Sequence, residues 1–494
     1  MSTALGRLLP LAVSSLLVPG LFAQAPMSIG NLAVLRSGDG IAPLTGDATP
    51  SFLEEWDPAG TFTTPVQPDI AIPTTAVGPQ FACTNSGTST SEGQLNLSTN
   101  GLYLTWGGYD APLGTLGVAE QANPPVARVI GRFSVFTGTL DTSTAITDAY
   151  SPTPTTTGPV SGNIRGVVSD DGNRFWTTSP VFNTTGGGVR FVANLGDLTS
   201  TLIAAGNIRH IGIYHGDLFV TQNSGGIRGV AQVGSGSLPT SAAGIALLNG
   251  FPSTSGPSSY DMFWANPSTV YVADDRIGSS GGGIQKWTET GGVWSLQYTL
   301  TLGLSAGCRT VTGKVLNGVT TLYGIANSGS TTQIITVTDT GPASVVTSLR
   351  TAPTNMLYRG IRFIDKPTSL QRVSTPCGPR TIDIVCTGTC ELGTDQFTKV
   401  RGIQGFGGLI ALDVSSTFVN LNVVPFLPLC DCVLGVSVNP VGIIGANNFT
   451  LSVAPFWATL GLQVYIQGID YAPPTPGCPE LTLDLSDTYV FTVQ

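Results

Sequence analysis

The sequence has few charged residues. Asp, Glu, Lys and Arg make up 10% of its 494 residues, against about 25% in a typical soluble domain. The 21 Lys and Arg residues form no run and the net charge is −9. This composition argues against a nucleic-acid partner, because phosphate binding needs clustered basic residues. The apolar fraction of 41% is large enough for a core, so the scarcity of charge does not predict disorder.

Long apolar runs are also missing after the first residues. Nothing beyond Phe22 approaches the roughly 18 uninterrupted apolar residues of a membrane span. At the start of the chain, Arg7 precedes an interrupted apolar run from Leu8 to Phe22, and Ala23-Gln24-Ala25 has the small-x-small form of a cleavage site. We expect residues 1–25 to be a signal peptide and the mature protein to be secreted or on the cell surface. An uncleaved anchor is the alternative.

Two familiar catalytic motifs are absent from the sequence. It contains no Walker loop and no H-E-x-x-H pair. Long amphipathic helical patterns are missing as well, whereas the 63 Gly and 34 Pro residues indicate frequent turns. Turn residues between β-branched runs are typical of an all-β protein.

A repeated unit organises the first 365 residues. In its clearest copy, Val167-Val168 is a strand, Asp171-Gly172 is a hairpin turn, and Arg174 to Thr178 is the return strand. Asp-Gly suits a tight hairpin because such turns need positive φ. The unit recurs at 207–230, and looser copies follow at 260–286 and 308–337.

The spacing of the units predicts a β-propeller over residues 30–365. Most units lie about 44 to 52 residues apart, which suits four-stranded blades. We count six, if the N-terminal strands at 32–35, 52–56 and 61–66 combine with the C-terminal strand at 357–364 to close the ring. Seven blades are the alternative, because the long interval 111–159 has room for another.

The hairpin sequence also resembles a known class of repeat. Ser169 to Trp176, SDDGNRFW, is similar to the segment that follows the innermost strand in the YVTN and NHL repeats of secreted bacterial β-propellers. This resemblance implies a fold. It implies no activity, because propellers host enzymes of several classes as well as pure binding proteins.

Charged residues recur at one place in the repeat, near the start of each innermost strand. Innermost strands line the central channel, so these side chains should meet at one mouth, where guanidinium groups would recognise carboxylates. We predict a binding site there for an anionic small molecule or an acidic glycan. The alternative is an internal plug, in which Asp261 and Glu92 pair with the arginines. In chain order, the predicted ligand-binding residues are Arg165, Arg209, Asp261, Arg309 and Arg359.

His210 is the candidate catalytic residue. It follows Arg209, and a histidine beside a bound anion could abstract a proton while arginine neutralises the carboxylate, as in a polysaccharide lyase. Strand alternation would, however, point the two side chains to opposite faces. No metal or other cofactor is indicated by a motif. Calcium is a possibility at Asp274 and Asp275, which precede a Gly-rich loop, although turn residues are the simpler interpretation.

The last quarter of the chain has a different pattern. Residues 366–376 are typical of a linker, and residues 377–494 contain about seven short alternating strands, which predict a small β-sandwich. Leu460-Gly461, Gln467 and Leu485-Ser486 resemble a C-terminal module of secreted planctomycete proteins. That resemblance implies no activity, so attachment, sorting or carbohydrate binding stay open.

Cysteine is concentrated in the same part of the chain. The eight cysteines, an even count in a secreted protein, predict disulfides, and we expect the domain at 377–494 to contain them. Zinc binding is the alternative, although no His lies in that part. The six tail cysteines are Cys377, Cys386, Cys390, Cys430, Cys432 and Cys478, and Cys83 and Cys308 lie in the repeats.

Two functional hypotheses follow. The first is a secreted or cell-surface binding protein, with the propeller as ligand platform and the sandwich as an anchor or accessory. The second is an extracellular polysaccharide-degrading enzyme, a lyase or hydrolase, with its site at the channel mouth. We favour the first, because no convergent catalytic set is visible in the sequence.

Overall fold

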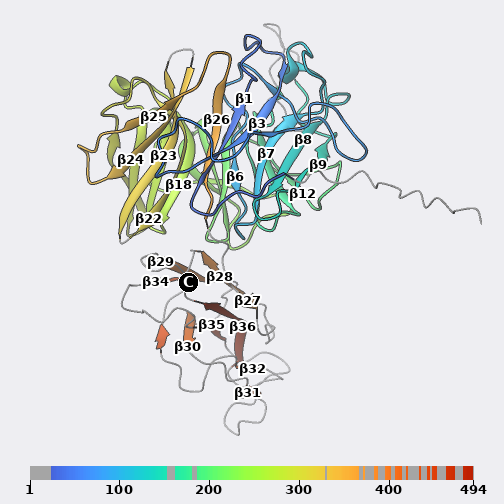
Figure 1. Ribbon diagram of the computed structural model, residues 1–494. Coiled ribbons are helices and arrows are strands. Elements are labelled where there is room, and N and C mark those ends of the chain that lie inside the picture. The colour runs from blue at the N-terminus through green and yellow to red at the C-terminus, as the bar shows by residue number, and fades with distance from the viewer. Residues whose placement is uncertain are drawn as a thin grey trace, which may run out of the picture.

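The strands between Leu32 and Phe363 form a six-bladed β-propeller (Figure 1). The computed structural model describes residues 24–365, except 153–161, 181–185, 317 and 329–330, and beyond them the backbone of ten strands. Within this described part, the only helices are two short 3-10 turns, η1 (Val118–Glu120) and η2 (Gly278–Ser280). None of its helices has the length and apolar character needed to cross a bilayer. The all-β, six-bladed prediction is confirmed.

Each blade is a four-stranded antiparallel sheet, named here by its innermost strand. The β6 blade contains β6 (Asn96–Leu97), β7 (Tyr103–Tyr109), β8 (Arg128–Ser134) and β9 (Leu140–Ile146). The β10 blade contains β10 (Val167–Ser169), β11 (Phe175–Ser179), β12 (Gly188–Val192) and β13 (Thr201–Ala204). The β14 blade contains β14 (Ile208–Tyr214), β15 (Asp217–Ser224), β16 (Ile227–Val233) and β17 (Ile245–Leu247). The β18 blade contains β18 (Ser259–Asn266), β19 (Thr269–Asp274), β20 (Gly283–Thr290) and β21 (Val293–Leu300). The β22 blade contains β22 (Cys308–Leu316), β23 (Val319–Ser328), β24 (Thr331–Asp339) and β25 (Thr347–Thr351).

The two ends of the propeller sequence share the sixth blade. Its innermost strand is β26 (Leu357–Phe363), which pairs with β1 (Leu32–Ser37), followed by β3 (Ser51–Trp56) and β4 (Ile70–Ala71). Figure 1 shows the orange β26 beside the blue β1. The register runs from Leu32 opposite Phe363 to Ser37 opposite Leu357. This pairing leaves no open edge between the first and last blades.

Local chemistry explains the hairpin that the sequence predicted between β10 and β11. Gly172 has a φ of 83°, in the left-handed region that glycine tolerates. The Asp171 carboxylate accepts hydrogen bonds from the backbone N–H groups of Asn173 at 2.7 Å and Arg174 at 3.1 Å. The turn is therefore fixed by the Asp-Gly pair itself.

Two details of the sequence interpretation were wrong. The described residues of the interval 111–159 form no seventh blade. Its strands, β8 and β9, are the outer pair of the β6 blade. The expected strand at 61–66 is also absent, because Phe62 adopts a positive φ of 55° and its ring stacks on Trp56 at 5.4 Å. The outer edge of that blade is β4 instead.

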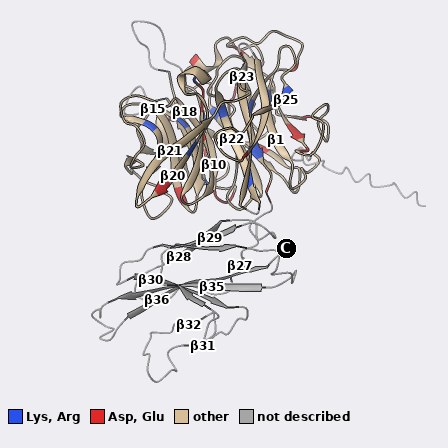
Figure 2. Cartoon of the chain, turned by 90° about the vertical axis from the view of Figure 1, so that its left-hand side faces the viewer, with Lys and Arg blue, Asp and Glu red and all other residues tan. Residues whose placement is uncertain are grey.

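The core lies between neighbouring blades, where apolar faces of adjacent sheets meet. Trp176 of the β10 blade and Ile211 of the β14 blade, for example, are both fully buried in one cluster. Phe251 stacks on Trp287 across the next junction, with ring centroids 4.1 Å apart. Charged side chains are sparse over the propeller (Figure 2), so burial of apolar surface supplies most of its stability.

Beyond residue 365 the described backbone is also entirely strands. A two-stranded pair contains β31 (Val419–Asn420) and β32 (Val433–Leu434). A three-stranded sheet contains β28 (Asp383–Thr387), β29 (Asp395–Arg401) and β34 (Asn448–Ser452). A five-stranded sheet contains β27 (Gln371–Arg372), β36 (Thr482–Thr492), β35 (Gln463–Ala472), β30 (Gly407–Asp413) and β33 (Gly442–Ile444). The predicted linker contains β27. The domain bounds stay a prediction. Residues 1–23 of the predicted signal peptide and the tail cysteine side chains lie outside the described residues.

The two propeller cysteines are free thiols. Cys83 and Cys308 are both buried and form no disulfide. Burial raises the pKa of Cys83 to about 12, so its thiol stays protonated near neutral pH and is a poor nucleophile. The expectation of disulfides does not hold for this pair.

Replacing Gly360 on β26 with alanine should destabilise the ring. A Cβ there would lie 2.4 Å from the Leu95 backbone nitrogen and 2.6 Å from the Gly93 carbonyl oxygen. Because both neighbours are backbone atoms, the strain cannot be relieved by a rotamer change, and we expect a loss of about 1–3 kcal/mol. Thermal unfolding measures it. Gly244→Ala, with nothing within 4 Å of its new Cβ, is the control, and equal midpoints for the two variants would refute the packing argument.

Candidate functional site

A repeated irregularity places the arginines at one end of the channel. Arg209, Arg309 and Arg359 are each the extra residue of a β-bulge near the start of an innermost strand. Arg165 occupies the same place, since it and Gly166 both bond to the Thr178 backbone. A bulge turns its extra side chain away from the normal alternation. We call the four arginines, with Tyr260, the arginine mouth.

The fifth predicted member, Asp261, does not belong to the arginine mouth. On β18 the pairing shifts between Ser259 and Met262, so Tyr260 is the bulge residue and Asp261 follows it. The repeat alignment was therefore one residue out of register in this blade. Tyr260 takes the arginine position, and its ring lies 4.0 Å from the Arg209 guanidinium carbon and 5.6 Å from that of Arg309.

An acidic residue absent from the predicted ligand-binding set lies between two of these arginines. The Asp275 carboxylate is 3.6 Å from Arg209 Nη1 and 3.7 Å from Arg309 Nε. Arg209 Nη1 also donates to the Ser258 hydroxyl at 3.0 Å. Arg209 and Arg309 thus share one carboxylate at distances longer than a direct hydrogen bond.

Arg165 and Arg359 have neutral partners instead. Arg165 Nη1 donates to the Asn207 side-chain oxygen at 2.7 Å and the Ile208 carbonyl at 2.8 Å. Arg359 donates to backbone carbonyls of Ser86, Gly87 and Ser89. Neither forms an ion pair with any residue that the structure describes. Both guanidinium charges are therefore partly buried without a direct counterion.

Glu92 is an acidic group that acts electrostatically on this side of the mouth, but its oxygens are occupied. They accept hydrogen bonds from the Ser86 backbone N–H at 2.9 Å, the Tyr109 hydroxyl at 2.6 Å and the Asn163 amide. Glu92 favours the charged forms of Arg165 and Arg359 at a distance. The alternative prediction was a plug in which Glu92 pairs with the arginines. Among the described residues, Glu92 makes no direct contact with an arginine.

A cavity of about 400 Å³ opens beside the mouth between the β22 blade and the closing blade. Arg309 and Arg359 line it together with hydroxyl and amide groups. These polar neighbours are Thr88, Thr90, Asn327, Thr331, Thr332 and Tyr358. A cavity of this volume is in the range of small-molecule sites.

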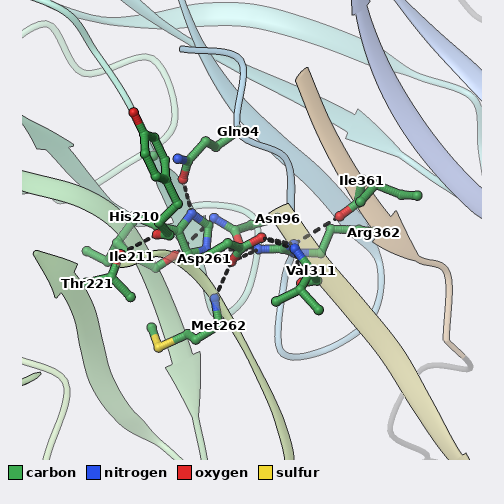
Figure 3. A network of polar contacts seen from close by, with 12 residues as sticks. Gln94, Asn96, His210, Ile211, Thr221, Asp261, Met262, Val311, Ile361 and Arg362 are labelled. Carbon is green, nitrogen blue, oxygen red and sulfur yellow. Dashed lines mark hydrogen bonds and ion pairs between the residues drawn. The ribbon is translucent and has the colours of Figure 1, made fainter. Parts of the chain in front are cut away.

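Below the mouth, a hydrogen-bond network that we call the central plug fills the channel (Figure 3). Its members are Gln94, Asn96, His210, Asp261 and Arg362. Arg362 binds both oxygens of Asp261, at 2.8 and 3.0 Å, and also donates to Asn96 at 2.9 Å.

The central plug joins all six blades. From the β6 blade, Asn96 donates to the Val167 carbonyl of the β10 blade at 2.8 Å and the Ile211 carbonyl of the β14 blade at 3.1 Å. Asp261 of the β18 blade accepts from the Val311 N–H of the β22 blade at 3.0 Å. Arg362 of the closing blade completes the set. One connected network therefore fixes the position of every innermost strand.

The charges of the plug are compensated internally. Burial raises the pKa of Asp261, but Arg362 and His210 outweigh burial and hold it well below its usual range. Asp261 is 1% exposed and is therefore an ionised carboxylate with a bidentate guanidinium partner, the strongest type of charged hydrogen bond.

His210 is buried in the plug, with 1% of its surface exposed. Its Nδ1 contacts the Gln94 side-chain oxygen, and its Nε2 lies 2.8 Å from Arg362 Nη2 and 2.9 Å from Asp261 Oδ1. Burial lowers the pKa of His210, although Asp261 opposes this.

Strand alternation was expected to point Arg209 and His210 to opposite faces of the sheet, and this expectation was wrong. Because Arg209 is a bulge residue, both Arg209 and His210 face the channel, at successive depths. The contacts of His210 hold the innermost strands together, and its catalytic role stays an untested hypothesis.

The opposite end of the channel has a smaller cavity of about 240 Å³, which we call the aromatic cavity. Its walls include Tyr214, Phe263, Trp264 and Phe363, and its floor is the plug. The polar groups of that floor are already hydrogen-bonded to one another. In the wall of this cavity, Trp264 Nε1 has no hydrogen-bond partner within the described chain. Buried atoms at or near the arginine mouth also lack one: Arg165 Nε, Arg309 Nε, Arg359 Nε, Thr310 Oγ1 and Asn327 Oδ1.

The calcium candidates face arginines. Asp274 is fully buried, and its carboxylate binds Arg276 and accepts a hydrogen bond from the Gln285 amide at 3.0 Å. Asp275 lies between Arg209 and Arg309. No group of three or more potential metal ligands occurs among the residues described, and calcium binding stays an untested prediction.

Three residues of the plug were missed by sequence reasoning. Gln94 and Asn96 follow Glu92 in the period-2 pattern that leaves Gly93 and Leu95 on the other face, and this alternation was the available signal. No sequence signal pointed to Arg362, because the orientation of its side chain depends on the bulge at Arg359.

Comparison with known proteins gives only distant structural similarity. No protein-family model matches the chain, and no curated protein sequence matches it at a significant level. Apo AztD from Citrobacter koseri is 12% identical over 75% of this chain and 79% of its own, with a TM-score of 0.28. An exo-β-1,3-galactanase from Phanerochaete chrysosporium is 12% identical over 83% and 98%, with a TM-score of 0.31. The polysaccharide lyase Uly1 is 11% identical over 94% and 99%, with a TM-score of 0.29. Similarity this low transfers no activity.

Asp261→Asn should destabilise the propeller strongly at neutral pH. The variant leaves the buried Arg362 without its counterion, which costs about 3–5 kcal/mol. The folded-state pKa of Asp261 is below its unfolded value of about 3.9, so its contribution is present above pH 4 and is lost on acidification below it. Urea unfolding at pH 7 and pH 3 measures both effects. Asp57→Asn, in an exposed turn, should change neither, and a neutral Asp261→Asn effect would contradict the plug.

His210 should make stability depend on pH below neutrality. Its folded-state pKa is lowered from an unfolded value near 6.5. The unfolded chain therefore binds more protons as the pH drops below about 6.5, and stability decreases until the folded-state pKa is reached. Urea midpoints between pH 5 and 7.5 should fall toward acid in the wild type and less steeply in His210→Gln. Parallel curves would show that His210 is not the titrating group.

Proposed function

We propose that this protein is an extracellular binding protein that takes up a small anionic ligand at the arginine mouth. The observation that carries the proposal is Arg359, which is 7% exposed and has no carboxylate partner in the described chain. Burying a charge without a counterion is unfavourable. A ligand carboxylate would supply the missing partner.

The electrostatics of Arg359 support this proposal. Burial lowers the pKa of Arg359 to about 10; Glu92 opposes the shift and Arg309 adds to it. Two guanidinium groups close enough to repel one another are characteristic of sites that receive anions. Binding a carboxylate between them would relieve both the repulsion and the unfilled hydrogen bond at each Nε.

The cavity chemistry favours a sugar acid over a simple inorganic ion. Besides the two arginines, the lining of the 400 Å³ cavity includes Thr88 and Thr90. Hydroxyl groups donate and accept hydrogen bonds, which suits the ring hydroxyls of a sugar while the arginines hold its carboxylate. The signal-like residues 1–25 support an extracellular setting for such a ligand.

The alternative enzyme hypothesis has weaker support. A lyase needs a base that reaches the substrate, and His210 lies in the plug, already in contact with Gln94, Asp261 and Arg362. We therefore propose binding without turnover. The tail remains a candidate anchor or accessory domain.

Glucuronate, a sugar with one carboxylate, is a suitable probe, and glucose is its uncharged counterpart. Calorimetry on the full-length secreted chain should detect glucuronate and not glucose. Arg359→Gln and Arg309→Gln should each weaken glucuronate binding about 10- to 100-fold, because a charged hydrogen bond contributes about 1.5–3 kcal/mol.

Arg174→Gln is the matched control. Arg174 is paired with Asp170 on an exposed hairpin, so the variant removes one positive charge outside the mouth and should leave affinity unchanged. If all three variants weaken binding equally, the effect is one of net charge. Failure of acidic sugars and of simple carboxylates to bind would refute the proposed function.

A further inference from the structure

The order of the blades arranges the arginine mouth as two pairs. Going round the ring, the innermost strands are β6, β10, β14, β18, β22 and β26. Arg165 and Arg209 belong to the adjacent β10 and β14 blades. Arg309 and Arg359 belong to the adjacent β22 and β26 blades. Tyr260 separates the pairs on one side of the ring, and the segment around Glu92 separates them on the other.

The pairs face one another across the channel. In a six-bladed ring, blades three places apart are opposite. Arg165 is three blades from Arg309, and Arg209 is three blades from Arg359. Each member of one pair therefore has a counterpart on the far side of the mouth, and the plug closes the channel beneath them.

Interactions within each pair support this division. Burial lowers the pKa of Arg165 to about 10, Tyr260 opposes the shift, and Arg209 adds to it. Arg309 acts on Arg359 in the same direction. The two members of a pair are thus close enough to repel each other, and each pair contains at least one Nε without a hydrogen-bond partner in the described residues.

The charges of the mouth do not balance. Four guanidinium groups face two carboxylates, those of Asp275 and Glu92. Asp275 is shared between Arg209 and Arg309, and Glu92 is occupied by neutral donors. Two positive charges remain, one for each pair. A ligand with a single negative charge would leave one of them uncompensated.

We propose that the ligand of the arginine mouth is a diacid, with one carboxylate bound by Arg165 and Arg209 and the other by Arg309 and Arg359. This inference rests on the proposed function and specifies its ligand class. Carboxylates joined by a linker gain affinity because binding the first raises the effective concentration of the second.

The test is calorimetry on the full-length chain with linear dicarboxylates from succinate to pimelate. Monocarboxylates of equal chain length and inorganic sulfate are the comparison ligands. At least one dicarboxylate should bind 10-fold or more tightly than its monocarboxylate and than sulfate. The optimal chain length then reports the span between the pairs.

Variants of one pair make the test specific. In the double variant Arg165→Gln/Arg209→Gln, the best dicarboxylate should lose its advantage and bind no more tightly than its monocarboxylate. Arg174→Gln should keep the full advantage. Circular dichroism of each variant verifies that the propeller is folded.

The outcomes separate the two proposals. If monocarboxylates bind as tightly as every dicarboxylate, or if sulfate binds more tightly, the diacid inference is wrong and the anion site survives. If the double variant keeps the dicarboxylate advantage, the second carboxylate is bound elsewhere and the inference is also wrong. If no anion binds, both proposals fail.

Discussion

The bidentate pairing of Arg362 with Asp261 at the centre of the ring is the interaction on which the architecture depends. Arg362 comes from the last strand of the propeller and Asp261 from the β18 blade. Through Asn96 and Val311 the same network reaches the remaining blades. A buried ion pair is costly to desolvate, and its value depends on complete hydrogen bonding. Here both charges have their partners, so the network fixes the mutual position of the innermost strands.

This plug divides the channel into two ends with different chemistry. The floor of the aromatic cavity consists of groups that have already satisfied one another. The arginine mouth has excess positive charge and buried N–H groups without partners in the described chain. Buried polar atoms are rarely left unsatisfied without a reason. A ligand is the simplest reason at a place where four arginines meet and where the described part of the chain supplies two carboxylates.

The sequence predicted the architecture well because its signals were local and repeated. The Asp171-Gly172 turn and the period of the units gave the blades, and closure through 357–364 followed from the unpaired ends. The convergence of four arginines was predicted for the same reason. The register in the β18 blade and the orientation of His210 were not, because a β-bulge has no reliable sequence signature and moves every following side chain to the other face. Arg362 was missed on the same ground.

A crystal structure of the full-length protein with a bound dicarboxylate tests the central claim most directly. The account predicts electron density for the diacid across the arginine mouth, with one carboxylate within 3.2 Å of the Arg309 and Arg359 guanidinium groups and the other at Arg165 and Arg209. Density only in the aromatic cavity, or a mouth filled by a segment of the chain itself, would contradict it.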